Sequence, residues 1–360
     1  MFRTPLCDKL ASSGAVIGTY AGAETALTFG DPRREFGALR SSCGVYDLGW
    51  RAKLVVTGSD RNRWLNGMVT NNVRDLALNR GNYNFILSPQ GRILGDCYIY
   101  NRGEHYIVDT EVSQVETIKS LFDRYIIMDD VEVTDLTDKL TSIAVHGPRA
   151  ADVLKKAGFE GLDADPMELC DVTWRGIGLS VTRMASEEFL TYELWSSPQN
   201  TAAIWDAVVE AGAMPAGMEA LELFRVAAGV PRYGRDIRER DLPQETEQTY
   251  ALHFSKGCYV GQEIVERIRS RGQVHRTFTG FQIEGPPPAP GTKIQIAGND
   301  VGEITSAASV PSSDADRALA LGYIRREHSQ PGTKVEVSGV RATVAAIPFA
   351  EAKALSGVEQ

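Results

Sequence analysis

The sequence predicts an α+β fold that ends in a small antiparallel barrel, and three observations support this prediction. Strand-like and helix-like segments follow one another without the regular alternation of a doubly wound α/β sheet. A proline-rich stretch at residues 284–291 interrupts the pattern near the C-terminus. Beyond it, GTKIQI (291–296) and GTKVEV (332–337) repeat each other and alternate apolar with polar residues, as strands with one buried face do.

The composition is that of a folded globular protein. The chain has 360 residues, enough for two or three domains, of which 43% are hydrophobic and 24% are charged. The net charge of −9 argues against bulk nucleic-acid binding and against adhesion to an anionic membrane. We expect no signal peptide and no membrane span, because no apolar run reaches roughly 18–20 residues. The five cysteines are scattered and form no CxxC pair, which excludes a disulfide scaffold or a zinc ribbon and predicts a cytoplasmic protein.

The first two thirds of the chain are predicted to mix strands with helices. Runs of β-branched and aromatic residues predict strands at 53–57, 93–100, 106–108, 131–134, 142–145, 179–182 and 192–195. Apolar residues at helical spacing predict helices at 115–125, 201–210 and 219–228. A further helix should begin after Gly147-Pro148 and end at Gly158, because proline favours the first helical turn and glycine the position after the last.

The proline-rich stretch is the clearest candidate for a domain boundary. Proline stiffens the chain and cannot donate a ladder hydrogen bond, so the stretch suits a hinge. We therefore predict a core domain at residues 1–245, a motif segment with a linker at 246–283, and a barrel domain at 284–360.

The densest chemical feature is the segment KGCYVGQE at residues 256–263. The glycines beside Cys258 allow close backbone approach and leave the thiol accessible. Residues 256–276 hold five Lys or Arg and two Asp or Glu, a balance of +3 on a chain of net charge −9. Such a segment points to an anionic ligand or partner and favours the thiolate form of Cys258. The alternative is a glycine turn before a solvated basic helix, with Cys258 merely packed.

This motif, with Arg267 and Gly272 after it, resembles that of the YgfZ family of folate-binding proteins, a branch of the glycine cleavage T-protein (aminomethyltransferase) superfamily. The resemblance extends along the chain through WLNGMVTNNVRDL (64–76), LSPQGRILGD (87–96), SIAVHGPRAADVL (142–154), FRVAAGVPRYGRDI (224–237) and AAIPF (345–349). It implies a three-lobed cloverleaf, in which two intertwined α+β lobes surround a folate channel and a C-terminal antiparallel barrel forms the third lobe.

The resemblance also implies a folate site. T-proteins carry two adjacent aspartates where this chain reads Gly95-Asp96, so one carboxylate remains. The resemblance implies that Asp96 accepts hydrogen bonds from the pterin ring and, as a catalytic residue, orients the reacting nitrogen. The alternative for Asp96 is a strand-end residue satisfied by local backbone. Tyr83 is expected to supply an aromatic wall, with Phe85 as the alternative. The T-protein segment RTGYTGEDG reads RMASEEFLT (183–191) here, so its glycines are lost, which argues against full aminomethyl-transfer chemistry.

Three more folate contacts are considered on the same grounds. Phe189 replaces the folate-facing glutamate of that segment, and Glu188 could substitute for it only if the loop shifts. Arg225 matches an arginine of the superfamily helix that ends in Ala-Gly, and its guanidinium would hold the carboxylates of a folate tail. The alternative for Arg225 is an inter-lobe salt bridge. Tyr192 would stack on the pterin or benzoyl ring, or is instead a core aromatic of its strand.

The function implied by the resemblance is that of a tetrahydrofolate-binding protein that supports assembly or repair of iron–sulfur clusters in client enzymes, including tRNA-modifying ones. Cys258 would be the functional thiol. The residues expected to fix its geometry or to meet a partner are Lys256, Gly257, Tyr259, Gly261, Gln262, Glu263 and Arg267.

Expected partners are a reduced folate and iron–sulfur client or assembly proteins, but neither nucleic acid nor a membrane, and we expect a monomer. No metal site is predicted, because His253 and Cys258 are only two potential ligands. The alternative function is that of a tetrahydrofolate-dependent aminomethyltransferase or other one-carbon transferase. A third reading is a scaffold of the same fold that binds only proteins.

Overall fold

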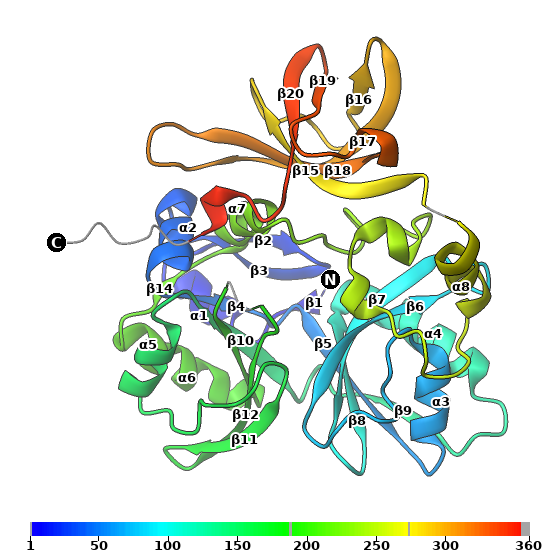
Figure 1. Cartoon of the computed structure of the whole chain (residues 1–360). Coiled ribbons are helices and arrows are strands. Elements are labelled where there is room, and N and C mark those ends of the chain that lie inside the picture. The colour runs from blue at the N-terminus through cyan, green and yellow to red at the C-terminus, as the bar shows by residue number, and fades with distance from the viewer. Residues whose placement is uncertain (1, 187–188, 273, 354–360) are drawn as a thin grey trace. The chain divides into compact units, whose positions relative to one another are not determined.

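The computed structural model describes residues 2–186, 189–272 and 274–353, which divide by their contacts into two compact units (Figure 1). Unit one comprises residues 2–84 and 96–221, and unit two comprises residues 85–95 and 222–353. The chain passes between the units within β6 (Gly81–Leu87), β7 (Ile93–Asn101) and α7 (Met218–Ala228). The hairpin that joins β6 to β7 therefore belongs to unit two, although the strands begin and end in unit one.

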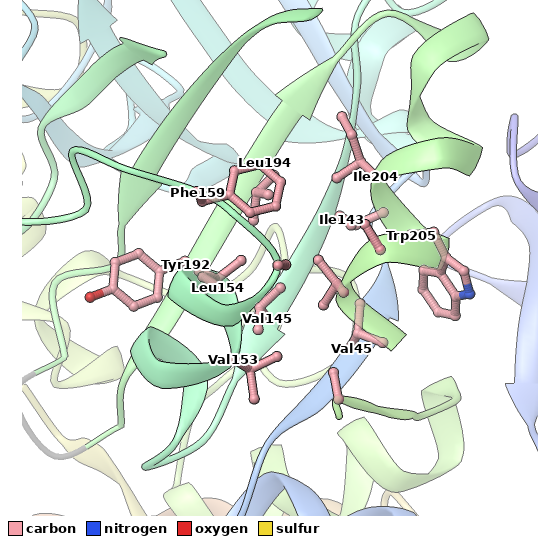
Figure 2. Packing of buried hydrophobic residues seen from close by; sticks show 14 of the residues in the cluster. Val45, Ile143, Val145, Val153, Leu154, Phe159, Tyr192, Leu194, Ile204 and Trp205 are labelled. Atoms are coloured by element: carbon pink, nitrogen blue, oxygen red, sulfur yellow. The ribbon is translucent and has the colours of Figure 1, made fainter. Parts of the chain in front are cut away.

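A six-stranded sheet forms the larger hydrophobic core of unit one. Its order is β11-β12-β13-β10-β4-β14, with bounds Leu169–Trp174, Ile177–Arg183, Thr191–Ser196, Thr141–His146, Gly44–Asp47 and Met214–Pro215. Every residue of the central strands β10 and β13 is buried, because α5 (Ala150–Lys156) and α6 (Pro198–Glu210) pack beside them. Figure 2 shows this packing, in which Val153 and Leu154 of α5 and Ile204 and Trp205 of α6 lie against the strands.

Unit one also contains a five-stranded sheet, which includes strands β6 and β7. Its order is β6-β7-β8-β5-β9, where β8 is Tyr106–Glu111, β5 is Arg51–Thr57 and β9 is Glu132–Asp135. Helices α3 (Arg61–Met68) and α4 (Val115–Tyr125) meet through the rings of Trp64 and Phe122, whose centroids lie 5.1 Å apart. The buried residues of α4 recur at the helical spacing that predicted it, and the 3-10 turn η1 (Val112–Gln114) precedes it.

The N-terminal part of unit one is a three-stranded sheet of order β1-β3-β2, with bounds Phe2–Arg3, Ala23–Thr28 and Val16–Tyr20. Helix α1 (Cys7–Ser12) packs on it. Helix α2 (Pro32–Ser41) begins with proline in its first turn, and the Asp31 side chain accepts hydrogen bonds from the backbone N–H groups of Arg33 and Arg34. This cap satisfies donors that the first turn of a helix leaves unpaired.

Unit two consists of the β6–β7 hairpin, short helical segments and a closed barrel. Before the barrel come η2 (Pro243–Thr246), η3 (Thr249–Ala251) and α8 (Gln262–Arg271). The barrel order is β15-β18-β17-β16-β19-β20, with bounds Arg276–Ile283, Arg317–Arg325, Asn299–Val310, Lys293–Ile296, Lys334–Val337 and Val340–Ala345. The 3-10 turns η4 (Arg326–His328) and η5 (Ala350–Ala352) follow β18 and β20.

The predicted fold class is confirmed, and one reading of the sequence is corrected. All the strands and helices predicted above are present within a few residues of their expected ends. The two repeated segments become β16 and β19, which pair with each other through Ile294 and Val337. The proline-rich stretch is not a hinge before the barrel, because β15 already belongs to the barrel and the prolines connect it to β16. Because proline has no N–H to donate to a β-ladder, it is equally compatible with a loop between two barrel strands and with a linker between domains.

In the described part of the chain, no helix combines the length and the apolar character needed to cross a membrane.

Candidate functional site

Asp96 is a half-buried carboxylate held by side chains within the sheet of unit one. It lies inside β7, so it is not a strand-end residue as the alternative supposed. Its Oδ2 accepts a hydrogen bond of 2.6 Å from the hydroxyl of Tyr83, and its Oδ1 accepts one of 2.8 Å from Nε2 of Gln114. The backbone N–H of Asp96 donates to Oε1 of Gln114 at 3.0 Å. Each carboxylate oxygen keeps a second lone pair, so Asp96 is oriented but still able to accept from a ligand.

Next to Asp96 lies a buried group of charges that sequence reasoning did not find. The Arg51 Nε–H donates to both carboxylate oxygens of Asp109, at 3.1 and 3.0 Å, and Lys53 Nζ donates to Asp109 Oδ1 at 2.9 Å. The guanidinium carbon of Arg51 lies 5.4 Å from the ring centroid of Tyr98. Burial alone would lower the pKa of Arg51, but the nearby carboxylates, Asp109 foremost and Asp96 among them, raise it. This arginine therefore stays cationic beside the Asp96 carboxylate.

Glu193 is the second carboxyl of this region and was also missed. It is 5% exposed, and the indole N–H of Trp195 donates to its Oε2 at 3.0 Å. Burial, followed by the charge of Asp109, raises the pKa of Glu193, although Arg51 and Lys53 act in the opposite direction. The signal in the sequence was a glutamate within an otherwise fully buried strand, which is rare unless the carboxyl has a task or a partner.

The Asp96 region thus places two carboxyls of different character near one cation. The half-buried carboxylate of Asp96 accepts hydrogen bonds, whereas Glu193 is buried and has its pKa raised, chiefly by that burial. Tyr83, which was predicted as an aromatic wall, packs its ring 5.1 Å from that of Tyr98. Phe85 is fully buried.

Tyr192 and Phe189 are the other residues of unit one considered as folate contacts. Tyr192 belongs to the main hydrophobic cluster of unit one and is 5% exposed. Figure 2 shows its ring beside Leu154 and its hydroxyl turned away from the cluster. This position favours the role of a core aromatic. The N–H of Phe189 donates to the hydroxyl of Ser186 in the loop before β13, and Glu188 lies outside the described residues.

Arg225 is fully used within unit two. All five of its N–H groups are bonded: two to Glu222, at 3.0 and 2.9 Å, one to Asp236 at 2.6 Å, one to the carbonyl of Val230 and one to the hydroxyl of Ser306. Arg225 is 7% exposed and Asp236 is completely buried. A guanidinium with no remaining donor is not available for a folate tail, so the structure favours an ion-pair role, here between α7, the following loop and the barrel strand β17.

Cys258 lies in the loop between η3 and α8 of unit two. It is exposed, whereas Cys7, Cys43 and Cys97 are buried and Cys170 is intermediate. Gly257 and Gly261 on either side have φ angles of +97° and +81°, which L side chains rarely adopt. The conformation that presents the thiol therefore depends on these two glycines.

Packing against the β6–β7 hairpin explains why Gly261 and Gly91 are needed. A Cβ on Gly261 would lie 2.5 Å from the carbonyl oxygen of Ser88, and a Cβ on Gly91 would lie 2.8 Å from Cβ of Ile264. Both pairs lie in unit two, so residues 87–91 of the hairpin and residues 261–264 meet there. By contrast, a Cβ on Gly257 would meet nothing within 4 Å.

The other motif residues divide into buried supports and exposed charges. Gln262 Oε1 accepts from the backbone N–H of Tyr259 at 3.2 Å and closes the turn after the thiol. Lys256 is 2% exposed, with Nζ 4.9 Å from the ring centroid of Tyr259. Glu263 and Arg267 form an exposed i,i+4 ion pair of 2.7 Å, which contributes little to stability and leaves both side chains accessible. Among the described residues, no group of three or more His, Cys, Asp or Glu side chains is placed to hold a metal ion.

Comparisons with known proteins define the family. Residues 6–256 match the GCVT N-terminal domain, and residues 276–350 match the glycine cleavage T-protein C-terminal barrel domain. The chain therefore belongs to the glycine cleavage T-protein family.

Relatives along the whole length of the chain agree with this assignment. A protein of Rubrobacter xylanophilus named aminomethyltransferase is 28% identical, and the match covers 96% of this chain and 94% of that protein. One of Halothermothrix orenii with the same name is 26% identical over 97% of this chain and 100% of its own. The crystal structure of glycine cleavage system aminomethyltransferase T from Bartonella henselae superposes with a TM-score of 0.87 at 21% identity, covering 98% and 99% of the two chains. That likeness shows the fold.

Proposed function

We propose that this protein binds a reduced folate in the Asp96 region and uses the thiol of Cys258 in the assembly or repair of iron–sulfur clusters in client enzymes. The observation that carries the proposal is the exposed thiol between two positive-φ glycines, in a loop seated on the β6–β7 hairpin. A cysteine that is merely packed needs no such loop. The YgfZ-type motif KGCYVGQE supplies the class of chemistry.

The residues of the Asp96 region fit a reduced pterin. Asp96 keeps lone pairs for ring N–H or amino groups, and Tyr83 and Gln114 hold it in one orientation. Glu193 offers a second carboxyl, and Arg51 keeps positive charge beside both. When bound, a reduced folate supplies or accepts a one-carbon unit at its ring nitrogens. Arg225 is left out of the proposed contacts because its donors are already used.

The folate part is tested by calorimetric titration with 5-formyltetrahydrofolate. The Asp96→Asn variant should bind about ten- to a hundredfold more weakly, since a charge-assisted hydrogen bond contributes about 1.5–3 kcal/mol. Asp138→Asn, on an exposed carboxylate of the same unit, is the control and should bind like the wild type. Equal binding by Asp96→Asn and wild type would remove Asp96 from the site.

The thiol part is tested by rescue of bacterial cells that lack their own YgfZ-type protein. Methylthiolation of tRNA by a cluster-dependent enzyme is the readout. The wild type should restore it, Cys258→Ala at equal abundance should not, and Cys170→Ala should behave like the wild type. Full rescue by Cys258→Ala would refute the thiol role without touching the folate result.

A second candidate is tetrahydrofolate-dependent aminomethyl transfer, which the comparisons favour. The relatives described above are named aminomethyltransferases and match nearly the whole chain. Asp96 with its oriented carboxylate also suits this chemistry. Release of methylenetetrahydrofolate from an aminomethyl-lipoyl carrier protein would establish it. The lost glycines of segment 183–191 argue for a rate far below that of a T-protein assayed beside it.

A further inference from the structure

Unit two contains a cationic pocket whose described lining includes neither Cys258 nor Asp96. Its volume is about 620 Å³. Among the described residues, its charged lining consists of Arg92, Arg240, Arg276, Lys293 and Arg325, with Glu245, Asp300 and Glu303, and His275 lies beside them. On a chain of net charge −9, a pocket with excess positive charge is an anomaly that needs a reason.

Two of the three acidic side chains are ion-paired, whereas Asp300 accepts, among the described residues, only from the amide of Gln295, at 2.8 Å. Glu303 accepts from Arg240 and from Lys293, the latter at 3.4 Å. Glu245 accepts from Arg276 at 3.1 and 3.0 Å.

Arg92 and Arg325 are the two arginines that stay unpaired. Both are exposed, and neither forms an ion pair with any described residue. Arg92 donates only to the backbone carbonyl of Arg240. Arg92 and Arg325 are therefore cations of the pocket that have no carboxylate partner among the described residues.

A buried hydroxyl in the wall is the second, independent observation. Tyr323 lines the pocket and is 0% exposed, and its hydroxyl has no hydrogen-bond partner among the described residues. The guanidinium carbon of Arg276 lies 4.8 Å from the centroid of its ring. Buried polar groups are usually paired, so this hydroxyl in the wall of the pocket still has a proton to donate to a ligand oxygen.

The shape and lining of the surroundings indicate what kind of ligand fits. Arg325 also lines two neighbouring pockets of about 840 and 470 Å³, the larger of which includes His275 and Arg326. Apart from Val301, Gly302 and Tyr323, the described residues that line the central pocket carry ionisable side chains. This lining thus suits charged groups better than an aromatic body.

We propose that this pocket binds a compact polyanion with phosphate or carboxylate groups, recognised by Arg92, Arg325 and the hydroxyl of Tyr323. Arginine presents a planar fork of donors that matches either oxyanion. The site lies within unit two and does not use the thiol or the folate contacts. Its success or failure is therefore separate from that of the proposed function.

The test is calorimetric titration of the full chain at 50 mM salt with two probes, sodium tripolyphosphate and tri-γ-glutamate. Binding of either supports the pocket, and the preferred probe tells phosphate from carboxylate chemistry. Arg325→Gln and Arg92→Gln should each weaken binding about tenfold or more, and Tyr323→Phe several-fold. Arg341→Gln, an exposed arginine on β20 outside the pocket, is the matched control and should stay within about twofold of the wild type.

Thermal unfolding of each variant confirms that it is folded before its affinity is interpreted. Absence of binding by both probes would overturn the proposal. So would an equal loss of affinity in Arg341→Gln and Arg325→Gln, because the attraction would then be unspecific. A single-stranded RNA that binds through these arginines while both small anions fail would also overturn it, in favour of a nucleic-acid surface.

Discussion

Replacing Arg225 by methionine tests whether this residue holds unit two together or binds a folate tail. Methionine occupies much of the space of the aliphatic stem but has no donors. Asp236, which is completely buried, would lose its ion pair with Arg225. It would keep three neutral hydrogen bonds, from the backbone N–H of Arg232 and the hydroxyls of Thr305 and Ser306.

The expected cost follows from this geometry. Removal of one partner of a buried ion pair leaves an uncompensated charge and costs about 3–5 kcal/mol of the free energy of unfolding. The control is Arg235→Met, because Arg235 is 40% exposed and makes one ion pair of 3.2 Å with Glu222. That exposed pair should contribute no more than about 1 kcal/mol.

The assay must report on unit two, since all five tryptophans lie in unit one. Native-state hydrogen exchange of the β17 amides (Asn299–Val310) measures the local free energy of opening. It should fall by the expected amount in Arg225→Met and hardly change in Arg235→Met. The structural role is refuted if Arg225→Met leaves this free energy within about 1 kcal/mol of the wild type. If the affinity of that variant for folate polyglutamate also falls about tenfold, Arg225 instead binds the folate tail.

Three further predictions concern pH, thiol reactivity and the glycines. Burial lowers the pKa of His146 to about 4, below its unfolded value of about 6.5. The free energy of unfolding should therefore fall by about 3 kcal/mol as the pH drops from 6.5 to 4. In urea titrations, the free energy of unfolding of His146→Gln should depend less on pH than that of the wild type. Iodoacetamide at pH 8 should label Cys258 first and leave Cys43 unmodified, because burial raises the pKa of the Cys43 thiol to about 12. Peptide mass spectrometry identifies the labelled cysteines, and fast labelling of Cys43 would contradict the structure. Gly261→Ala should destabilise the protein more than Gly257→Ala, by about 1 kcal/mol or more in thermal unfolding. Both positions have positive φ, but only a Cβ at Gly261 would also meet a backbone oxygen. Equal destabilisation would show that the chain around Ser88 can move to make room for the added methyl group.

Local patterns were sufficient for the elements and for the motif cysteine. The periodicity of 115–125 is that of α4, and the repeated GTK segments are β16 and β19. Such patterns reflect which face of one element is buried, and that information is local to the element. The proline-rich stretch misled because a missing N–H donor is compatible with a loop inside a barrel as well as with a hinge.

Local sequence patterns predicted only some of the residues of the site. Asp96 and Cys258 stood out by their motifs, but Glu193, Arg51 and Asp109 come from three separate strands and are meaningful only together. Arg225 looked available in the sequence because nothing local reveals that Asp236 and Ser306 use its donors.

By itself the sequence determined the fold class, the helices and strands, and the position of an exposed cysteine between glycines that need positive φ. Only the tertiary structure decided which polar groups are already paired: it left lone pairs on Asp96, occupied every donor of Arg225 and left the hydroxyl of Tyr323 without a partner among the described residues. The physical reason is that hydrogen bonds and charge pairs join residues far apart in the chain, and each is satisfied or not according to distance and direction in space.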